Sequence, residues 1–193
     1  MARWNIKIRD SETGQTNASE EELAQRAERT GGGRNQRQSV RASLDEAQQL
    51  VEENRFDDAL AAYEEILEKN PDVAQAYVGI GNLHARRGEY DEALEYYNGA
   101  LHIRKDLVPA LIMSGNAYLK KGSENKALEK FREVLAANPG ITQARVKIAR
   151  ICAKQGRDEE AIHCLQEALS YNPQFKPAHL ALASIYQKRG HNE

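Results

Sequence analysis

Apolar and small residues recur along this chain with a fixed period of 34 residues. Chance does not keep one period through several residue types, so the period indicates repeated structural units. Glycine recurs at Gly88, Gly122, Gly156 and Gly190, alanine at Ala59, Ala93, Ala127 and Ala161, and leucine at Leu67, Leu101, Leu135 and Leu169.

The repeats divide most of the chain into units when Pro71, Pro139 and Pro173 are set at position 32. Position 8 is then Ala or Gly and position 20 is Ala, whereas positions 21, 24 and 28 carry large side chains. Small residues let two helices approach closely, and large residues fill the space beside the contact. The four full units are 40–73, 74–107, 108–141 and 142–175, and a half unit follows at 176–193.

Each full unit is predicted to contain two helices. In the second unit the first helix runs from Ala74 to Arg87, and Gly88 ends it because glycine tolerates the left-handed conformation of a helix stop. Asp91 and Glu92 then fit the first turn of a second helix, which runs to about Ile103.

The third unit carries Leu111-x2-Ser114-Gly115-x2-Tyr118, then Ala127-x3-Phe131, then Pro139. This pattern resembles that of the tetratricopeptide repeat (TPR) family. The resemblance covers residues 40–193, although the second unit lacks the proline. It implies an all-α, right-handed TPR solenoid of four repeats plus a C-terminal half repeat.

Both ends of the chain depart from the repeat. Residues 1–39 form a mostly irregular extension, with a short strand at 4–8, a short helix at about 20–29 and a break at 31–33. In the half unit, Leu182, Ala183 and Tyr186 keep motif positions, so its outer face is not clearly polar. Either this face self-associates or more sequence follows in the natural protein.

The TPR resemblance implies that side chains at positions 2, 5, 6, 9, 12 and 13 line a concave groove. The groove then has an apolar row at position 5, amides at position 9 and cations at position 13 beyond the first unit. These rows suit a peptide with acidic and apolar residues. The candidate partner-binding residues are Val78, Asn82, Arg86, Ile112, Met113, Asn116, Lys120, Lys147, Arg150 and Lys154.

Two groove-region residues have open interpretations. Gly79 either allows a ligand to approach the helix closely or results from random sequence drift that the helix tolerates. Arg145 occupies a position that is normally apolar, so we expect it to flank the packing rather than serve the groove. The carboxylate clamp that some TPR proteins use for chaperone tails is not expected, because Val78, Met113 and Gln143 replace its residues.

Composition excludes several other functions. The formal net charge is −2 and the inner rows lack stacking groups, which disfavours nucleic acid. Two Cys exclude a disulfide scaffold, and no His pair has metal-ligand spacing. We expect no catalytic residues, metal or cofactor, no membrane insertion, and a soluble cytoplasmic protein.

The sequence therefore predicts a non-catalytic scaffold or adaptor that binds a partner peptide or helix in the groove. The alternative is a structural protein that self-assembles through the half repeat and the N-terminal extension. A third interpretation, an RNA-binding helical repeat, is disfavoured because the inner rows lack stacking groups.

Overall fold

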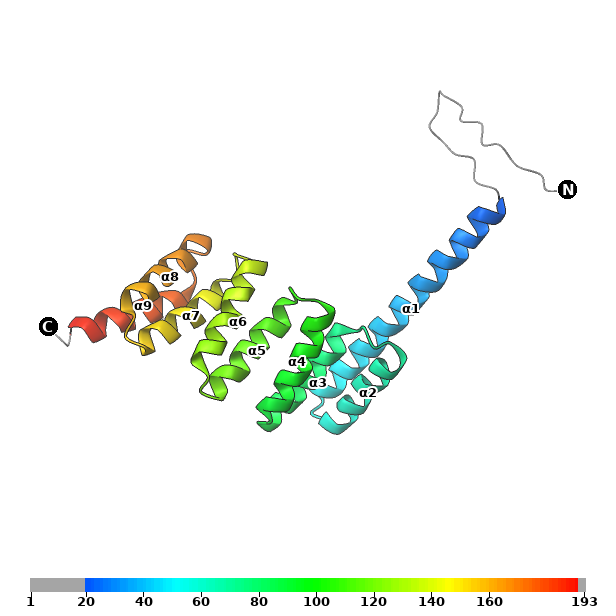
Figure 1. Ribbon diagram of the computed structural model, residues 1–193, viewed down its shortest axis with the longest axis horizontal. Coiled ribbons are helices and arrows are strands. Elements are labelled where there is room, and N and C mark those ends of the chain that lie inside the picture. The colour runs from blue at the N-terminus through cyan, green and yellow to red at the C-terminus, as the bar shows by residue number, and fades with distance from the viewer. Residues whose placement is uncertain (1–19, 191–193) are drawn as a thin grey trace, which may run out of the picture. The chain divides into compact units, whose positions relative to one another are not determined.

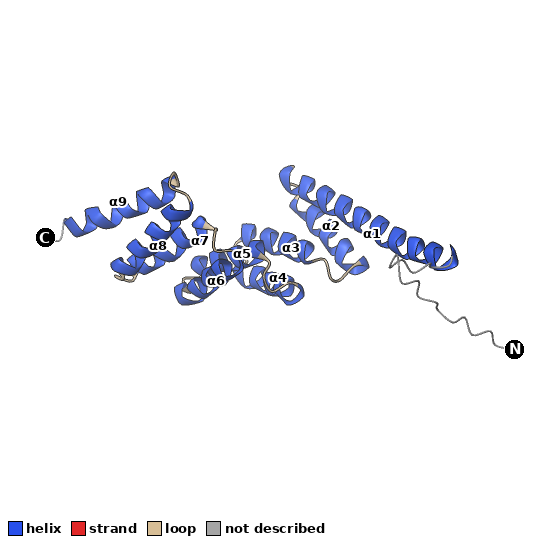
Figure 2. Ribbon diagram, turned by 90° about the horizontal axis from the view of Figure 1, so that it is seen from above, coloured by secondary structure: helices blue, strands red, loops and turns tan. Residues whose placement is uncertain are grey.

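The computed structural model describes residues 20–190, and the chain divides after Ala42 into two units that are described separately. Every regular element in the described residues is an α-helix (Figures 1 and 2). The predicted strand at 4–8 lies outside the described residues. The helices are α1 (Glu20–Glu52), α2 (Phe56–Lys69), α3 (Ala74–Arg87), α4 (Tyr90–Ile103), α5 (Val108–Lys120), α6 (Glu124–Ala137), α7 (Thr142–Lys154), α8 (Asp158–Tyr171) and α9 (Lys176–Gly190).

Helix α1 begins at the predicted residue but is much longer than predicted. It runs to Glu52 without interruption, so the expected break at 31–33 is wrong for the described backbone. A helical glycine costs only about 1 kcal/mol and still donates its backbone hydrogen bond, unlike proline. The division after Ala42 lies close to the predicted boundary between the extension and the repeats.

The helices α2 to α9 follow the 34-residue period. Helices α3 and α4, α5 and α6, and α7 and α8 pack as pairs. Each pair contacts the next one through α4 with α5 and through α6 with α7. Figure 1 shows this succession of pairs in chain order. The predicted start and end of α3 and the predicted end of α4 are confirmed. The half unit forms one helix, α9, which contacts both α7 and α8.

Glycines follow the ends of α3, α5 and α7, as predicted for Gly88, whereas Asn54 takes the corresponding place after α1. Gly88, Gly122 and Gly156 have φ values of 83°, 73° and 77°, a region that residues with a side chain rarely adopt. Asn138 closes the α6–α7 connection by accepting the Gly140 backbone hydrogen at 3.0 Å, and Asn172 does the same for Gln174. These turns fix where each successive helix begins.

In α4 and α6 a large aromatic side chain packs against a glycine of the preceding first helix. A Cβ atom built on Gly81 would lie 2.6 Å from the Tyr97 ring, and one on Gly115 would lie 2.8 Å from Phe131. Tyr97 and Phe131 are 1% and 0% exposed. The position-24 ring therefore occupies the space that the missing side chain leaves, which confirms the small–large pairing predicted from the sequence.

Gly79 belongs to the same system of contacts. A Cβ atom on Gly79 would lie 2.4 Å from the Tyr63 ring of α2. The space that we considered for a ligand is thus filled by a buried ring of the preceding repeat. Packing of the Tyr63 ring therefore accounts for a glycine at this position, and Gly79 also lines a cavity on the first-helix face.

The last helix leaves apolar surface uncovered. In α9, Leu180 and Tyr186 are 70% and 51% exposed. Ala183 is exposed, whereas the equivalent Gly81, Gly115 and Ala149 are buried under a second helix. This face of α9 has the small–large character of the other first helices but no second helix covers it within the described residues.

The Gly79 contact can be tested by a Gly→Ala substitution, because the ring contact and helix propensity predict opposite changes in the free energy of unfolding. An exposed mid-helix Gly→Ala change normally adds about 1 kcal/mol of stability. We expect Gly79→Ala to lower the free energy of unfolding by about 1–3 kcal/mol, because the Tyr63 ring must move. Urea unfolding followed by circular dichroism measures the change.

The matched control for this test is Gly190→Ala. Gly190 is also helical, and nothing lies within 4 Å of a Cβ atom built there. We expect this control to be neutral or stabilising. A Gly79→Ala protein as stable as the control would contradict the proposed ring contact.

Candidate functional site

Cavities that open on first-helix residues of the array include one near its N-terminal end and two beside α9. We call the first the N-terminal cavity and the larger of the two beside α9 the C-terminal cavity. The N-terminal cavity has a volume of about 350 Å³ and the C-terminal cavity about 640 Å³. The second value lies in the usual range for ligand sites, and the first is at its lower end. The N-terminal cavity is lined by Gln48, Val51, Tyr63, Gly79, Asn82, Leu83, Ala85, Arg86, Tyr97 and Met113. The C-terminal cavity is lined by Gly140, Ile141, Thr142, Gln143, Val146, Lys147, Arg150, Phe175 and Pro177.

In the N-terminal cavity a buried tyrosine orients an amide. The Tyr97 hydroxyl donates a hydrogen bond of 2.9 Å to Asn82 Oδ1. Because the Asn82 oxygen is occupied in this way, its Nδ2 group remains as the donor toward the cavity. The preceding repeat has a longer version, in which the Tyr63 hydroxyl donates to Gln48 Oε1 at 3.5 Å.

The next repeat lacks this contact. Phe131 replaces tyrosine at position 24, and Asn116 Oδ1 is buried with no hydrogen-bond partner among the described residues. A buried unpaired oxygen costs about 1–3 kcal/mol. The amide row predicted from the sequence therefore contains one oriented member, Asn82, and one that the protein leaves unpaired, Asn116.

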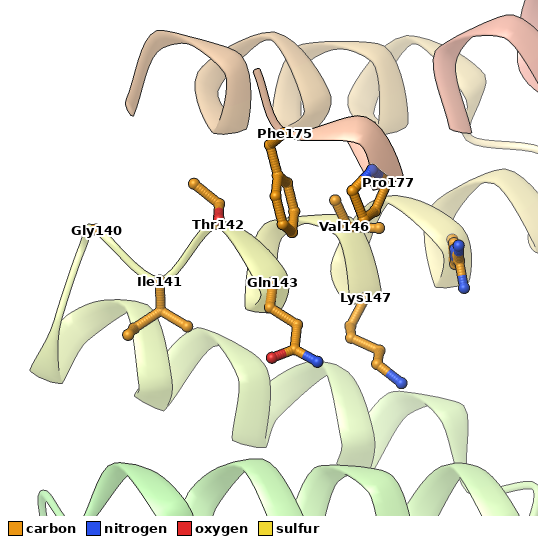
Figure 3. A pocket seen from close by; sticks show the side chains of 9 residues that line it. Gly140, Ile141, Thr142, Gln143, Val146, Lys147, Phe175 and Pro177 are labelled. Carbon is orange, nitrogen blue, oxygen red and sulfur yellow. The ribbon is translucent and has the colours of Figure 1, made fainter. Parts of the chain in front are cut away.

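The C-terminal cavity combines an apolar wall with cations. In Figure 3 the side chains of Phe175 and Pro177, which lead into and begin α9, lie close to Val146 of α7. Gln143 and Lys147 extend from α7 in the direction away from Phe175. Arg150 completes the lining one turn further along the helix.

Lys147 experiences both burial and repulsion. Partial burial lowers the pKa of its ammonium group below the ordinary value, and the positive charges of Arg150 and Lys120 lower the pKa further. Among the described residues, no ion pair involves Lys120, Lys147 or Arg150. We call these three residues the groove cations.

Other cations link successive repeats away from these cavities. Arg87 pairs with Asp57, Lys121 with Asp91, and Arg189 with Glu159 at 2.8 Å. Each pair joins the end of one first helix to the start of the second helix before it, so the pairs form a ladder along the array. Lys154 pairs with Glu124 in this ladder. The structure thus separates Lys154 from the groove cations with which we had grouped it.

The remaining candidates have mixed surroundings. None of the ten candidates is buried, which leaves each at least partly accessible. Val78 and Ile112 also pack against the core, so only part of each can contact a ligand. Arg86 lies over the Phe56 ring, with 5.5 Å between its Cζ atom and the ring centroid. The two cavities together contain Asn82, Arg86, Met113, Lys147 and Arg150.

Arg145 lies in the packing, as expected. It is 6% exposed, contacts the Pro139 carbonyl and lies 3.5 Å from a Glu167 oxygen. Its Cζ atom is 4.5 Å from the centroid of the Tyr171 ring. Arg145 therefore holds α7 against α8 rather than facing a ligand.

Sequence reasoning missed the apolar wall of the C-terminal cavity. Ile141 and Phe175 line that wall, and both occupy position 34. Val73 and Leu107 occupy the same position in the first two units. An apolar residue at position 34 in every unit was thus the available signal, but it lies in a connection between predicted helices.

Two negative findings apply to the described residues. Residues 20–190 contain no helix with the length and apolarity needed to cross a bilayer. Residues 35–190, whose side chains are described, contain no group of three His, Cys, Asp or Glu side chains placed to hold a metal ion.

The Tyr97–Asn82 contact predicts opposite effects for two matched substitutions. Tyr97→Phe should lower the free energy of unfolding by about 1 kcal/mol, because it removes one hydrogen bond and keeps the ring. Phe131→Tyr should leave stability unchanged or raise it by up to about 1 kcal/mol, because a hydroxyl there can donate to Asn116. Urea unfolding measures both. A Tyr97→Phe protein as stable as the parent would show that this bond contributes nothing.

The buried hydroxyl also predicts a dependence on alkaline pH. Burial raises the pKa of Tyr97 from 10.0 to about 12. Between these values the unfolded chain releases a proton that the folded chain retains, so stability should fall as pH rises through this window. Tyr97→Phe should make that fall shallower. Equal slopes for the two proteins, measured by thermal unfolding at several pH values, would contradict the assignment.

Comparison with known proteins agrees with this architecture. Solved structures similar to the chain include MamA, with 19% identity, a TM-score of 0.67 and coverage of 75% of this chain and 84% of that one. YrrB, a TPR protein described as having an unusual peptide-binding site, has 24% identity, a TM-score of 0.64 and 78% coverage of both chains. PilF of Pseudomonas aeruginosa has 16% identity, a TM-score of 0.72 and coverage of 81% and 72%. At these identities the likeness concerns the fold.

No curated protein matches the sequence significantly. Two family profiles do match, both described as tetratricopeptide repeat, over residues 44–108 and 118–185. Together they span more than half of the chain, and the observed helix pairs have the period of that repeat. The chain therefore belongs to the tetratricopeptide repeat family, as an all-α TPR solenoid.

Proposed function

We propose that the array is a non-catalytic interaction scaffold that binds an extended or helical segment of a partner protein on its first-helix face. The observation that carries this proposal is the position of both cavities on that face. Each cavity combines apolar surface with a few polar groups, which is typical of recognition sites. The description of YrrB as a peptide-binding TPR protein agrees with a peptide partner.

The proposed ligand-binding residues have distinct tasks. Asn82 donates to a ligand carbonyl because Tyr97 occupies its own oxygen. Met113 supplies adaptable apolar contact, and Lys147 and Arg150 attract negative charge. The proposed partner segment accordingly carries acidic and apolar side chains.

The direct test is capture of partners by the full chain and by a groove variant. Asn82→Ala combined with Arg150→Glu should abolish capture, since it alters both cavities. Helical content should be unchanged, because neither residue is buried. Capture is read by mass spectrometry and helical content by circular dichroism.

The matched control is Asn98→Ala combined with Arg104→Glu. Both residues are exposed in and after α4, and neither lines the two cavities. The control should capture the same partners as the parent chain. Equal capture by the groove variant would overturn the proposal, and loss of capture by the control alone would move the site to the α4 face.

Self-assembly remains the second candidate, and the exposed face of α9 favours it. Leu180 and Tyr186 together place two large apolar side chains in solvent. One feature opposes head-to-tail stacking in the register of the repeat. At position 14, where Arg87, Lys121 and Arg189 supply ladder cations, the first unit has Glu53. Light scattering over a range of concentrations distinguishes the candidates, because only an assembling chain increases in mass with concentration.

A further inference from the structure

The C-terminal cavity differs from the N-terminal cavity in its charge. Its lining contains Lys147 and Arg150 and no acidic residue. Lys120, at the end of α5, adds a third positive charge close enough to repel Lys147. The apolar part of the lining includes Val146, Phe175 and Pro177.

The lack of anions at this cavity contrasts with the rest of the array. At the ends of α5, α7 and α9, a cation forms an ion pair with a carboxylate of the preceding second helix. The pairs are Lys121 with Asp91, Lys154 with Glu124, and Arg189 with Glu159. The groove cations have no such neighbour among the described residues. The protein therefore balances charge along the ladder and leaves positive potential at the cavity.

Burial makes this imbalance costly at Lys147. Its ammonium group is partly removed from water, and Arg150 and Lys120 raise the energy of its charged form. A negative group bound beside Lys147 would offset this cost, because it attracts the positive charges of all three groove cations. Arg150 can form two parallel hydrogen bonds to a planar carboxylate.

We infer that the C-terminal cavity is a pocket for an acidic–aromatic pair of adjacent side chains in a partner peptide. The carboxylate lies between Lys147 and Arg150, and the ring packs against Val146, Phe175 and Pro177. This inference rests on the proposed function and adds the chemistry of the bound segment. The volume of about 640 Å³ is in the range that holds small ligands.

A carboxylate fits this cavity better than a phosphate. A phosphate group carries nearly two negative charges at neutral pH, and an apolar wall raises the cost of removing that charge from water. A carboxylate carries one charge and matches the planar Arg150 group. The apolar wall then favours an adjacent ring over a second acid.

The test uses peptides of stated composition and the full ¹⁵N-labelled chain. The probe is the peptide Gly-Ser-Gly-Glu-Phe-Gly-Ser-Gly with blocked ends, titrated while backbone amide shifts are recorded. Companion peptides replace Glu with Gln, Phe with Ser, or Glu with phosphoserine. We expect saturating shifts in α7 and in residues 175–178, and a loss of affinity of about tenfold or more for the Gln and Ser peptides.

Two variants connect the binding to the groove cations. Lys147→Met with Arg150→Gln should weaken binding of the Glu-Phe peptide about tenfold or more and reduce its salt dependence, since Lys120 alone of the groove cations remains. The matched control Arg104→Gln with Lys105→Met removes two exposed cations outside both cavities and should not change affinity. Amide spectra that keep their dispersion show that each variant is folded.

Each remaining outcome overturns the inference. Equal affinity for the Gln peptide, tighter binding of the phosphoserine peptide, or no shifts at about 10 mM peptide would each contradict the pocket. Shifts confined to Asn82 and Met113 would overturn the acidic–aromatic pocket while the proposed groove stands. Shifts confined to α4, α6 and α8 would overturn both.

Discussion

The packing of an aromatic ring from α2, α4 or α6 against a glycine of a first helix determines much of the rest of this structure. Tyr97 on Gly81, Phe131 on Gly115 and Tyr63 on Gly79 place each ring where a Cβ atom would otherwise lie. These contacts bring helix backbones close together and bury the rings. The approach of the helices fixes which first-helix side chains remain outside the packing. The accessible face is thus a consequence of the core.

Position 24 couples this core to the candidate site. Where it is tyrosine, the ring fills the core and the hydroxyl reaches the amide at position 9, as Tyr97 reaches Asn82. Where it is phenylalanine, the packing is kept and the amide of Asn116 loses its partner. A change from tyrosine to phenylalanine at this buried position of the second helix therefore changes the hydrogen bonding on the accessible face. Repeats with the same fold can differ in recognition for this reason.

Periodicity predicted most of the fold because each structural rule acts within one or two repeats. Gly88 ends α3, and Ala93 and Tyr97 are buried, as local small–large patterning requires. The prediction was wrong for α1, since the glycines at 31–33 lower helix stability without preventing a helix. The packing role of Gly79 was missed because the ring that contacts it belongs to the preceding repeat.

The candidate site was predictable in outline but not in its charge pairing. The position of each cation within the repeat indicates which face of the helix it occupies. It does not indicate which cations have an ion-pair partner: Lys154 pairs with Glu124, about thirty residues earlier in the chain, whereas Lys147 has no such partner among the described residues. Phe175 was missed because it lies in the connection between α8 and α9, where helical periodicity does not predict which way a side chain points. Both omissions involve contacts between repeats, which one repeat's sequence does not specify.

We propose that a partner binds the first-helix face because that face keeps unpaired polar groups and cations. A crystal structure of the full chain with a segment of its captured partner tests this most directly. We expect a segment that lies along α3, α5 and α7, with a carboxylate between Lys147 and Arg150 and a carbonyl at Asn82 Nδ2. A segment bound to α4, α6 and α8, with both cavities unoccupied, would contradict it.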